Sequence, residues 1–391
     1  MYCCSIRSIE IFSFMKIIIS PNSFKGTISS IDACQIIERG ISSISPRMKL
    51  EKLPIADGGD GTLDFFKYYF SYKTISIESV NPLGEIINSE YILIENENIA
   101  VIEFANASGY NLMLNKEKKL QNMDSYGTGI QIKSAIEIGV KKIIISLGGS
   151  ATIDGASGIL RALGVKFFNN GKLIDKKNPI TEVTDIDISN FLVNKSNIEF
   201  ILLTDVNNKL LGDQGAVNVF GKQKGLLDKD FNIFEKYLYN FSSISSKVQG
   251  KDIISLKGGG SAGGAGGILS VFFNSKILNG TEFLLNKINY KKYLKNTDLV
   301  ITGEGSIDSQ SLNEKGPVAL MKYIKKINSN IIRIAIGGRV DYSVNDKLAN
   351  YFDYIFSISD NKSNSYSLEN SEYYLLEESK KIGKFLDHIK L

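Results

Sequence analysis

Five segments of this 391-residue chain place glycines, hydroxyls and charged side chains in or directly after apolar runs. They are residues 21–27, 56–62, 148–155, 205–225 and 298–308. In open α/β sheets, ligands bind at the turns that follow the strands, where glycine lets backbone amides approach an anion. The segments therefore favour chemistry on a small ligand that carries phosphate or carboxylate.

The first two segments each hold one prominent candidate. Lys25 lies in the turn Asn-Ser-Phe-Lys-Gly and can offer a positive charge to an anion, while an exposed lysine in a plain turn is the alternative. The second segment reads Asp-Gly-Gly-Asp-Gly-Thr from Asp57 and precedes an expected helix over 63–70. Asp60 or Thr62 can be explained as a cap of that helix. Asp57 has no such explanation and is the stronger candidate.

The third segment follows an expected strand over 142–147. Its small residues and exposed amides suit a phosphate or a carboxylate, although close packing of a helix on a sheet also favours small residues. The candidate binding residues in this segment are Gly148, Gly149, Ser150, Thr152 and Asp154.

The fourth segment begins with Asp205, which follows an expected strand over 200–203. Further along it, Lys222 and Lys224 lie between two glycines. Two lysines in a glycine-rich turn can neutralise phosphate, and a solvated charged turn is the alternative. Asp205 joins Asp57 as a candidate catalytic acid.

The fifth segment is an apolar strand over 299–302 that runs into Gly-Glu-Gly. Glu304 lies between the glycines, and Asp308 follows four residues later. Paired carboxylates at the end of a strand can hold Mg²⁺ together with phosphate oxygens. A helix cap is the alternative for Asp308.

Several classes of protein are excluded by composition. The only histidine is His388, near the end of the chain, so a Ser/His/Asp triad or a histidine metal site is not available. The net charge of +4 is spread along the chain, which does not predict a nucleic-acid surface. No apolar run approaches the roughly 20 residues that cross a bilayer. We expect no membrane segment.

The cysteines point to a reducing compartment. Cys3, Cys4 and Cys34 form neither a disulfide framework nor a zinc quartet, so we expect a cytoplasmic protein. Residues 1–14 lack the apolar core of a signal peptide, and Met15 opens a good strand. We interpret 1–14 as a non-native extension from an upstream start codon.

Short β-branched runs alternate with helical patterns through most of the chain, which predicts buried, largely parallel sheets. Between 72 and 103 the pattern changes to successive shorter strands, which marks entry into a second lobe. We expect one domain from 15–80 with 291–391, and a second α/β domain at 81–290. The chain length also suits two domains.

Two glycine-containing segments partly match known nucleotide-binding motifs. Gly258, Gly260 and Gly263 match the G-x-G-x-x-G of nicotinamide-binding folds, but one such match is a weak signal. A Walker A motif is absent, because Gly221-Lys222 is followed by Gln223. Any nucleotide would be bound in another way.

Taken together, the five segments resemble the successive signature blocks of the bacterial glycerate kinases, in the same order from Met15 nearly to the end. The resemblance extends to Ser23 in the first block and to Lys315 after the last one. It implies a Rossmann-like or flavodoxin-like parallel-sheet lobe, an inserted second α/β lobe, and a cleft between them for ATP, Mg²⁺ and D-glycerate. The oligomeric state stays open, with a homo-oligomer as one option.

The sequence departs from the family pattern at four positions: Ile153, Lys209, Ser306 and Glu314. At Ser306 the family usually has arginine, whose charge would stabilise the transferring phosphoryl group. We expect Asp57, ahead of Asp205, to orient or deprotonate the glycerate hydroxyl, with Lys25 as a further catalytic residue. A non-catalytic relative that binds a hydroxy acid or a nucleotide is the alternative, and a dehydrogenase using Gly258 is a weaker one.

Overall fold

The computed structural model describes residues 15–24, 26–114, 116, 119–175, 177–309, 311–313, 315–359 and 369–388. The expected extension at 1–14, Lys25 and Glu314 lie outside the described residues. The chain divides into two compact units. Unit 1 comprises 1–54, 290–309 and 321–391, and unit 2 comprises 55–289 and 310–320.

The first division falls after Pro54, whereas the sequence placed it near residue 80. The reason is local packing. Helix α2 (Thr62–Tyr69) contacts strand β5 (Ile99–Glu103), and β3 (Lys73–Val80) pairs with β4 (Ile86–Ile94). Residues 55–80 therefore bury their apolar surface within unit 2.

Unit 1 contains a five-stranded sheet in the order β14-β13-β12-β1-β2, and all its pairs are parallel. Counted along the chain, this is the order 2-1-3-4-5 of flavodoxin-like folds, in which ligands bind where the order reverses. Here the order reverses between β1 and β12. The strands are β1 (Lys16–Ile19), β2 (Lys49–Lys52), β12 (Leu299–Ile307), β13 (Ile332–Val340) and β14 (Tyr354–Ser357).

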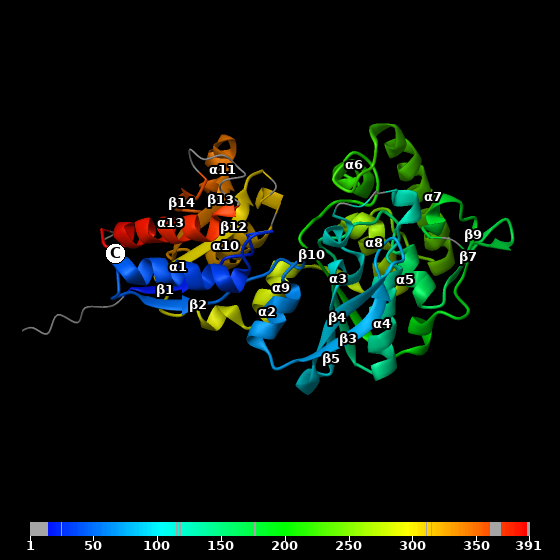
Figure 1. Cartoon of the computed structure of the whole chain (residues 1–391), viewed down its shortest axis with the longest axis horizontal. Coiled ribbons are helices and arrows are strands. Elements are labelled where there is room, and N and C mark those ends of the chain that lie inside the picture. The colour runs from blue at the N-terminus through cyan, green and yellow to red at the C-terminus, as the bar shows by residue number, and fades with distance from the viewer. Residues whose placement is uncertain are drawn as a thin grey trace, which may run out of the picture. The chain divides into compact units, whose positions relative to one another are not determined.

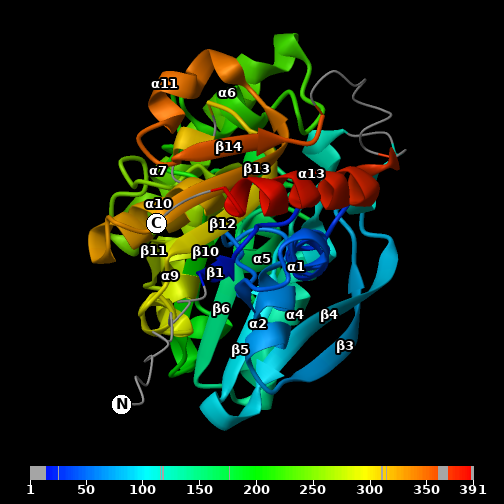
Figure 2. The same cartoon turned by 90° about the vertical axis from the view of Figure 1, so that its left-hand side faces the viewer.

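Helices α1 (Ser30–Ile44) and α13 (Ser371–Leu386) pack side by side on the sheet of unit 1 (Figures 1 and 2). Their apolar faces join alternate residues of β1, β12 and β13 in one core. The side chain of Ser29 caps α1 by accepting from the amide of Asp32. The other helices here are α10 (Gly316–Ile327), which begins in unit 2, and α11 (Asn345–Leu348).

Unit 2 contains a six-stranded sheet in the order β11-β10-β6-β5-β4-β3. The first four strands are parallel, and β4 and β3 extend the sheet antiparallel. Successive strands over 72–103 were predicted, but β3 and β4 are longer than expected, with 8 and 9 residues. The remaining strands of this sheet are β6 (Lys142–Ser146), β10 (Glu199–Thr204) and β11 (Lys276–Asn279). A small second sheet has β8 (Lys172–Leu173), β7 (Lys166–Asn169) and β9 (Asp185–Asp187).

Helices cover both faces of the large sheet (Figure 1). Helices α2 and α9 (Gly280–Lys287) contact β5, β10 and β11. The main core of unit 2 joins the sheet to α4 (Tyr126–Ile138), α5 (Ser157–Ala162), α7 (Phe231–Gln249) and α8 (Ala265–Phe272). Short helices α3 (Ala105–Ser108) and α6 (Ala216–Phe220) complete the unit. Among the described helices, none combines the length and apolarity that a bilayer crossing requires.

Candidate functional site

The loop from Asp57 to Thr62 in unit 2 is a tight, internally bonded turn. The amide of Gly59 donates to Asp57 Oδ1 at 3.0 Å, and the hydroxyl of Thr62 donates to the Gly59 carbonyl at 2.7 Å. Gly58 and Gly61 have φ of +86° and +89°, which non-glycine residues rarely adopt. The N-cap of α2 is Gly61, which has no side chain to cap the helix, and the Thr62 hydroxyl donates to Gly59 rather than accepting from the first turn. Asp57 is 2% exposed.

This loop packs directly on the turn that follows β6. A Cβ atom on Gly148 would lie 2.4 Å from the Cα of Gly59, so the two backbones approach as only glycine allows. A Cβ on Gly149 would lie 2.1 Å from Oδ1 of Asp60. Two of the five predicted segments thus meet at one edge of the unit 2 sheet.

Lys224 joins the same group. Its ammonium group donates to the hydroxyl of Ser150 at 2.7 Å and to the carbonyl of Thr152 at 2.8 Å. Burial lowers the pKa of Lys224 to about 7, although the charge of Asp154 opposes that shift. Lys222 is exposed, so the two lysines of one turn have different environments. Lys224 braces the Ser150–Thr152 backbone, and Lys222 remains the candidate for a ligand charge.

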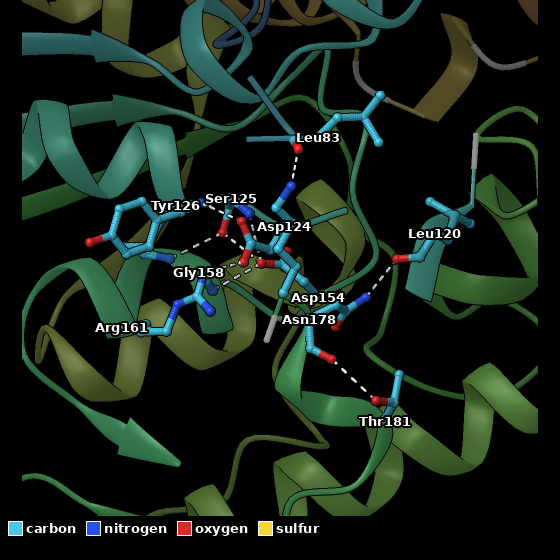
Figure 3. Close-up of polar contacts among 12 residues, drawn as sticks. Leu83, Leu120, Asp124, Ser125, Tyr126, Asp154, Gly158, Arg161, Asn178 and Thr181 are labelled. Carbon is cyan, nitrogen blue, oxygen red and sulfur yellow. Dashed lines mark hydrogen bonds and ion pairs between the residues drawn. The ribbon is translucent and has the colours of Figure 1, made fainter. Parts of the chain in front are cut away.

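Asp154 lies beneath this turn and is completely buried (Figure 3). Its Oδ2 atom accepts from the amide and hydroxyl of Ser125, at 2.9 and 2.7 Å, and from the amide of Gly158 at 3.1 Å. These bonds tie the start of α4 to the start of α5. The sequence placed Asp154 among the binding residues, and the geometry gives it a supporting position behind them.

The same polar network continues to two further groups (Figure 3). Arg161 donates to Asp124 at 2.7 Å, and its guanidinium carbon lies 4.9 Å from the ring centre of Tyr126. Burial raises the pKa of Asp124, and the charge of Arg161 opposes that shift. Asn178 donates to the carbonyl of Ile153 at 3.2 Å. Ile153, one of the four departures from the family pattern, is therefore fixed through its backbone carbonyl, and its side chain is fully buried.

The glycine-rich segment 258–264 is a packing element. A Cβ on Gly263 would lie 2.0 Å from the carbonyl oxygen of Thr152, and a Cβ on Gly260 would lie 2.2 Å from that of Lys209. Residues 251–257 form no strand, so the strand-turn-helix context of a dinucleotide fingerprint is missing here. The segment supports the Thr152 turn from behind, which removes the structural basis for a nicotinamide site.

Asp205 and Lys315 are two further candidates of unit 2. Asp205 follows β10, is partly buried, and lies next to Val206, whose amide donates to Thr204 Oγ1 at 3.3 Å. Because β10 pairs with β6, Asp205 and Gly148 follow neighbouring strands. Lys315 is partly buried in the return segment 310–320.

In unit 1, the first and fifth segments meet where the strand order reverses. The chain after β1 continues along β12, with the amide of Asn22 donating to the Gly303 carbonyl at 2.8 Å. The amide of Ser23 donates to Oδ1 of Asn22 at 2.9 Å. Ser23 and Glu304 thus belong to adjacent backbones at the position where this fold binds ligands.

The fifth segment is not the turn that we predicted. Strand β12 continues through Gly303 and Glu304 to Ile307. At about 3.3 Å per residue, β12 separates Glu304 from Ile307 by roughly 10 Å between Cα atoms, and Asp308 follows in a bend. The two acids therefore do not lie in one short turn after the strand. Glu304 is 9% exposed and Asp308 is partly buried.

Ser306 has a charged neighbour on the adjacent strand. Its register partner on β13 is Arg339, whose side chain is exposed. In a parallel sheet, register partners project to the same face. A guanidinium group therefore stands beside the position where the family usually carries arginine.

Glu103, which the sequence reading did not single out, ends β5 beside the Asp57 loop. It is 7% exposed, and its Oε1 accepts from the amide of Leu63 at 2.8 Å. Burial raises the pKa of Glu103 to about 7. An acid at the end of an otherwise apolar run, Ile-Ala-Val-Ile-Glu, was the available signal.

Comparison with known proteins agrees with this architecture. Residues 17–387 match the model of the glycerate kinase family. A glycerate kinase from Halalkalibacterium halodurans is 35% identical over 82% of this chain and 84% of its own length. A glycerate 2-kinase from Escherichia coli is 34% identical over 82% of this chain and 85% of its own length.

A solved structure supports the fold assignment. A crystal structure named for glycerate kinase 2 from Salmonella typhimurium LT2 has a TM-score of 0.78 and 32% identity, and the match covers 96% of this chain and 98% of that one. Both α/β units and the parallel sheets are therefore those of a known fold. This chain belongs to the glycerate kinase family.

Proposed function

We propose that this protein transfers the terminal phosphoryl group of ATP to a hydroxyl of D-glycerate. The observation that carries the proposal is the contact between the Asp57 loop and the Gly148–Thr152 turn, in a chain of this family. It brings a buried carboxylate and a set of backbone amides to one sheet edge. Phosphoryl transfer requires an oriented hydroxyl and neutralised phosphate oxygens rather than covalent catalysis by the protein.

In this mechanism Asp57 orients the acceptor hydroxyl and accepts its proton. One carboxylate oxygen is fixed by the Gly59 amide, which orients the group. Asp205, after the neighbouring strand β10, is the second candidate for the same role. The amides of Gly148, Gly149 and Ser150 would bind a phosphate or the glycerate carboxylate, whereas the Ala151 amide already donates to the Ser108 carbonyl at 2.9 Å.

Positive charge would come from Lys25, Lys222 and Lys315, which neutralise phosphate or carboxylate oxygens in this proposal. Lys224 contributes by holding the turn in place. We propose that Arg339 supplies the charge that Ser306 lacks, because the two residues are register partners. An arginine beside the transferring group stabilises charge that develops in the transition state.

A kinase of this type would use Mg²⁺, which neutralises phosphate charge when it is bound. Among the described residues, no group of three or more acids, cysteines or histidines is arranged to hold a metal alone. A buried carboxylate, completed by nucleotide phosphates, suits this ion. Glu304 is the residue we propose for it, with Asp308 acting directly or through water.

The proposed product is 2-phosphoglycerate rather than 3-phosphoglycerate. Support comes from the Escherichia coli relative, which is named glycerate 2-kinase. The expectation of a cytoplasmic enzyme stays a prediction.

The test is ADP release by the purified protein with ATP, Mg²⁺ and D-glycerate, followed by phosphorus NMR of the product. Turnover that depends on glycerate supports the kinase, and the NMR signal distinguishes the 2-phosphate from the 3-phosphate. No turnover, with ATP or glycerate still raising the melting temperature, would instead indicate the non-catalytic binding protein. The full chain and a version that starts at Met15 should be assayed together.

A further inference from the structure

Glu103 faces the Asp57–Thr62 loop from the sheet. Its register partner on β6 is Ser146, whose partner on β10 is Leu203. Register partners in a parallel sheet share a face. A Cβ on Gly58 would lie 3.0 Å from the Cβ of Leu203, so this row of side chains projects toward the loop.

Glu103 also provides the cap that helix α2 lacks locally. The first amides of a helix have no partner within it and usually find one in the side chain of the N-cap residue. The N-cap here is Gly61, which has no side chain. Glu103 Oε1 instead accepts from Leu63 at 2.8 Å, from a strand 40 residues away.

The charges that act on Glu103 are those of Asp60, in the loop, and Asp64, on α2. Both are acids and raise its pKa, in addition to the larger effect of burial, while the amides of Leu63 and Thr62 lower it. The carboxyl therefore exchanges its proton near neutral pH. The ionised form is the stronger acceptor for the amides of α2.

The cap bears on the geometry of the candidate site. Asp60 lies against Gly149, and Asp57 is bonded to Gly59, which packs on Gly148. A shift in the first turn of α2 would therefore move both acids relative to the 148–152 turn. Such shifts are costly in catalysis, since a misplacement of about 1 Å can reduce a rate by roughly 100-fold.

We propose that Glu103 is a positioning residue, which fixes the Asp57–Thr62 loop against the Gly148–Thr152 turn by capping α2 from β5. The kinetic part of this inference rests on the proposed kinase function. The structural part rests on the contacts alone. The two can be tested separately.

The kinetic test compares Glu103→Ala and Glu103→Gln with wild type between pH 5.5 and 8.5. Glu103→Ala removes the acceptor and should lower kcat by about 100-fold with little change in KM. Glu103→Gln keeps an acceptor oxygen, so it should recover most of kcat. It should also lose the change in activity through pH 7 that we expect of the wild type. The matched control is Glu137→Gln, an exposed residue on α4.

The structural test is hydrogen exchange of residues 57–66, measured by mass spectrometry. Glu103→Ala should speed exchange in this segment, and Glu103→Gln should not. In the wild type, protection should decrease between pH 5 and 8 after correction for intrinsic exchange, because the closed loop favours the protonated Glu103 carboxyl, and in Glu103→Gln it should stay constant. The comparison of wild type with Glu103→Gln tests the role of Glu103 even if Glu103→Ala does not fold.

The outcomes separate the two proposals. If the wild type shows no turnover on glycerate, the kinase proposal is overturned. The hydrogen-exchange data still test whether Glu103 fixes the start of α2. Unchanged exchange and unchanged kcat in a folded Glu103→Ala would overturn the positioning role. Identical pH profiles of kcat for wild type and Glu103→Gln would do the same, whereas an inflection that only shrinks in Glu103→Gln leaves a part for Lys224.

Discussion

The ammonium group of Lys224 donates hydrogen bonds to Ser150 Oγ and to the Thr152 carbonyl, at 2.7 and 2.8 Å. One buried lysine thereby holds both ends of a three-residue turn that follows the Gly148-Gly149 pair. Its own surroundings, with Asp154 as the opposing charge, lie inside unit 2. The turn is therefore shaped before any ligand arrives.

Lys224 should make stability depend on alkaline pH. Its pKa falls from 10.5 to about 7 on folding, so between these values the unfolded chain binds more protons and stability rises with pH. Lys224→Met removes this dependence. The difference in free energy of unfolding between wild type and variant should grow from pH 7 toward 10.5, by up to about 5 kcal/mol. Urea unfolding measures it.

The control for that experiment is Lys222→Met, which removes an exposed lysine two residues away. It removes the same single charge from the turn, so an effect that both variants share reflects net charge and not burial. A Lys224→Met profile parallel to the wild type would show that the buried lysine stays charged throughout.

Glu103 should make the free energy of unfolding fall as pH rises, and it should do so over a more acidic pH range than Lys224. Its pKa rises from 4.5 to about 7 on folding, so between these values the folded state binds more protons and stability falls as pH increases. The effect should reach up to about 3 kcal/mol and be absent in Glu103→Gln. Thermal or urea unfolding at pH 5, 6, 7 and 8 checks it. Equal slopes for the two proteins would contradict the assignment.

The two lysines illustrate what the sequence could not provide. Lys222 and Lys224 lie between the same glycines and have the same chemistry, yet one is exposed and the other buried. Which lysine side chain is buried depends on how the turn after α6 packs against Ser150, which is 74 residues from Lys224 in the chain. Local pattern identified the turn as functional but did not assign roles within it.

The end of strand β12 was predicted wrongly for a different reason. Gly303 and Gly305 are poor strand formers, which predicted that the strand ends before them. The matching glycines of β13 change the result, because a Cβ on Gly338 would lie 2.4 Å from the carbonyl oxygen of Gly305. Two glycine-containing strands can approach closely and keep their pairing. The parallel sheets themselves were predicted, since their β-branched runs are buried on both faces.

Gly148→Ala tests the contact between the two main loops. The added Cβ would lie 2.4 Å from the Gly59 Cα, so one backbone must move, which should cost about 1–3 kcal/mol and most of the activity. Gly171→Ala is the control. That glycine has φ of +80° with open space around it, so it should cost about 1 kcal/mol without affecting turnover. Normal activity in Gly148→Ala would show that the loops need not touch.

Asp57→Asn tests the proposed base. Asparagine keeps an oxygen for the Gly59 amide, so the loop and the melting temperature should change little. Loss of a general base reduces turnover by roughly 100- to 10,000-fold, and kcat for glycerate-dependent ADP release should fall within that range. The exposed Asp228→Asn serves as the control. Near-normal turnover in Asp57→Asn would transfer the role to Asp205.

The last prediction concerns an exchange of arginine between strands. Ser306 and Arg339 are register partners at the ends of β12 and β13, and their side chains project to the same face. Arg339→Ser should reduce kcat by about 100-fold, as expected when one group that stabilises transition-state charge is lost. Adding Ser306→Arg to that variant returns a guanidinium to the neighbouring strand and should restore most of the turnover. Arg47→Ser, an exposed arginine of the same unit, controls for charge alone. If Arg339→Ser is as active as wild type, or if the second substitution restores nothing, the charge at this edge has no part in phosphoryl transfer.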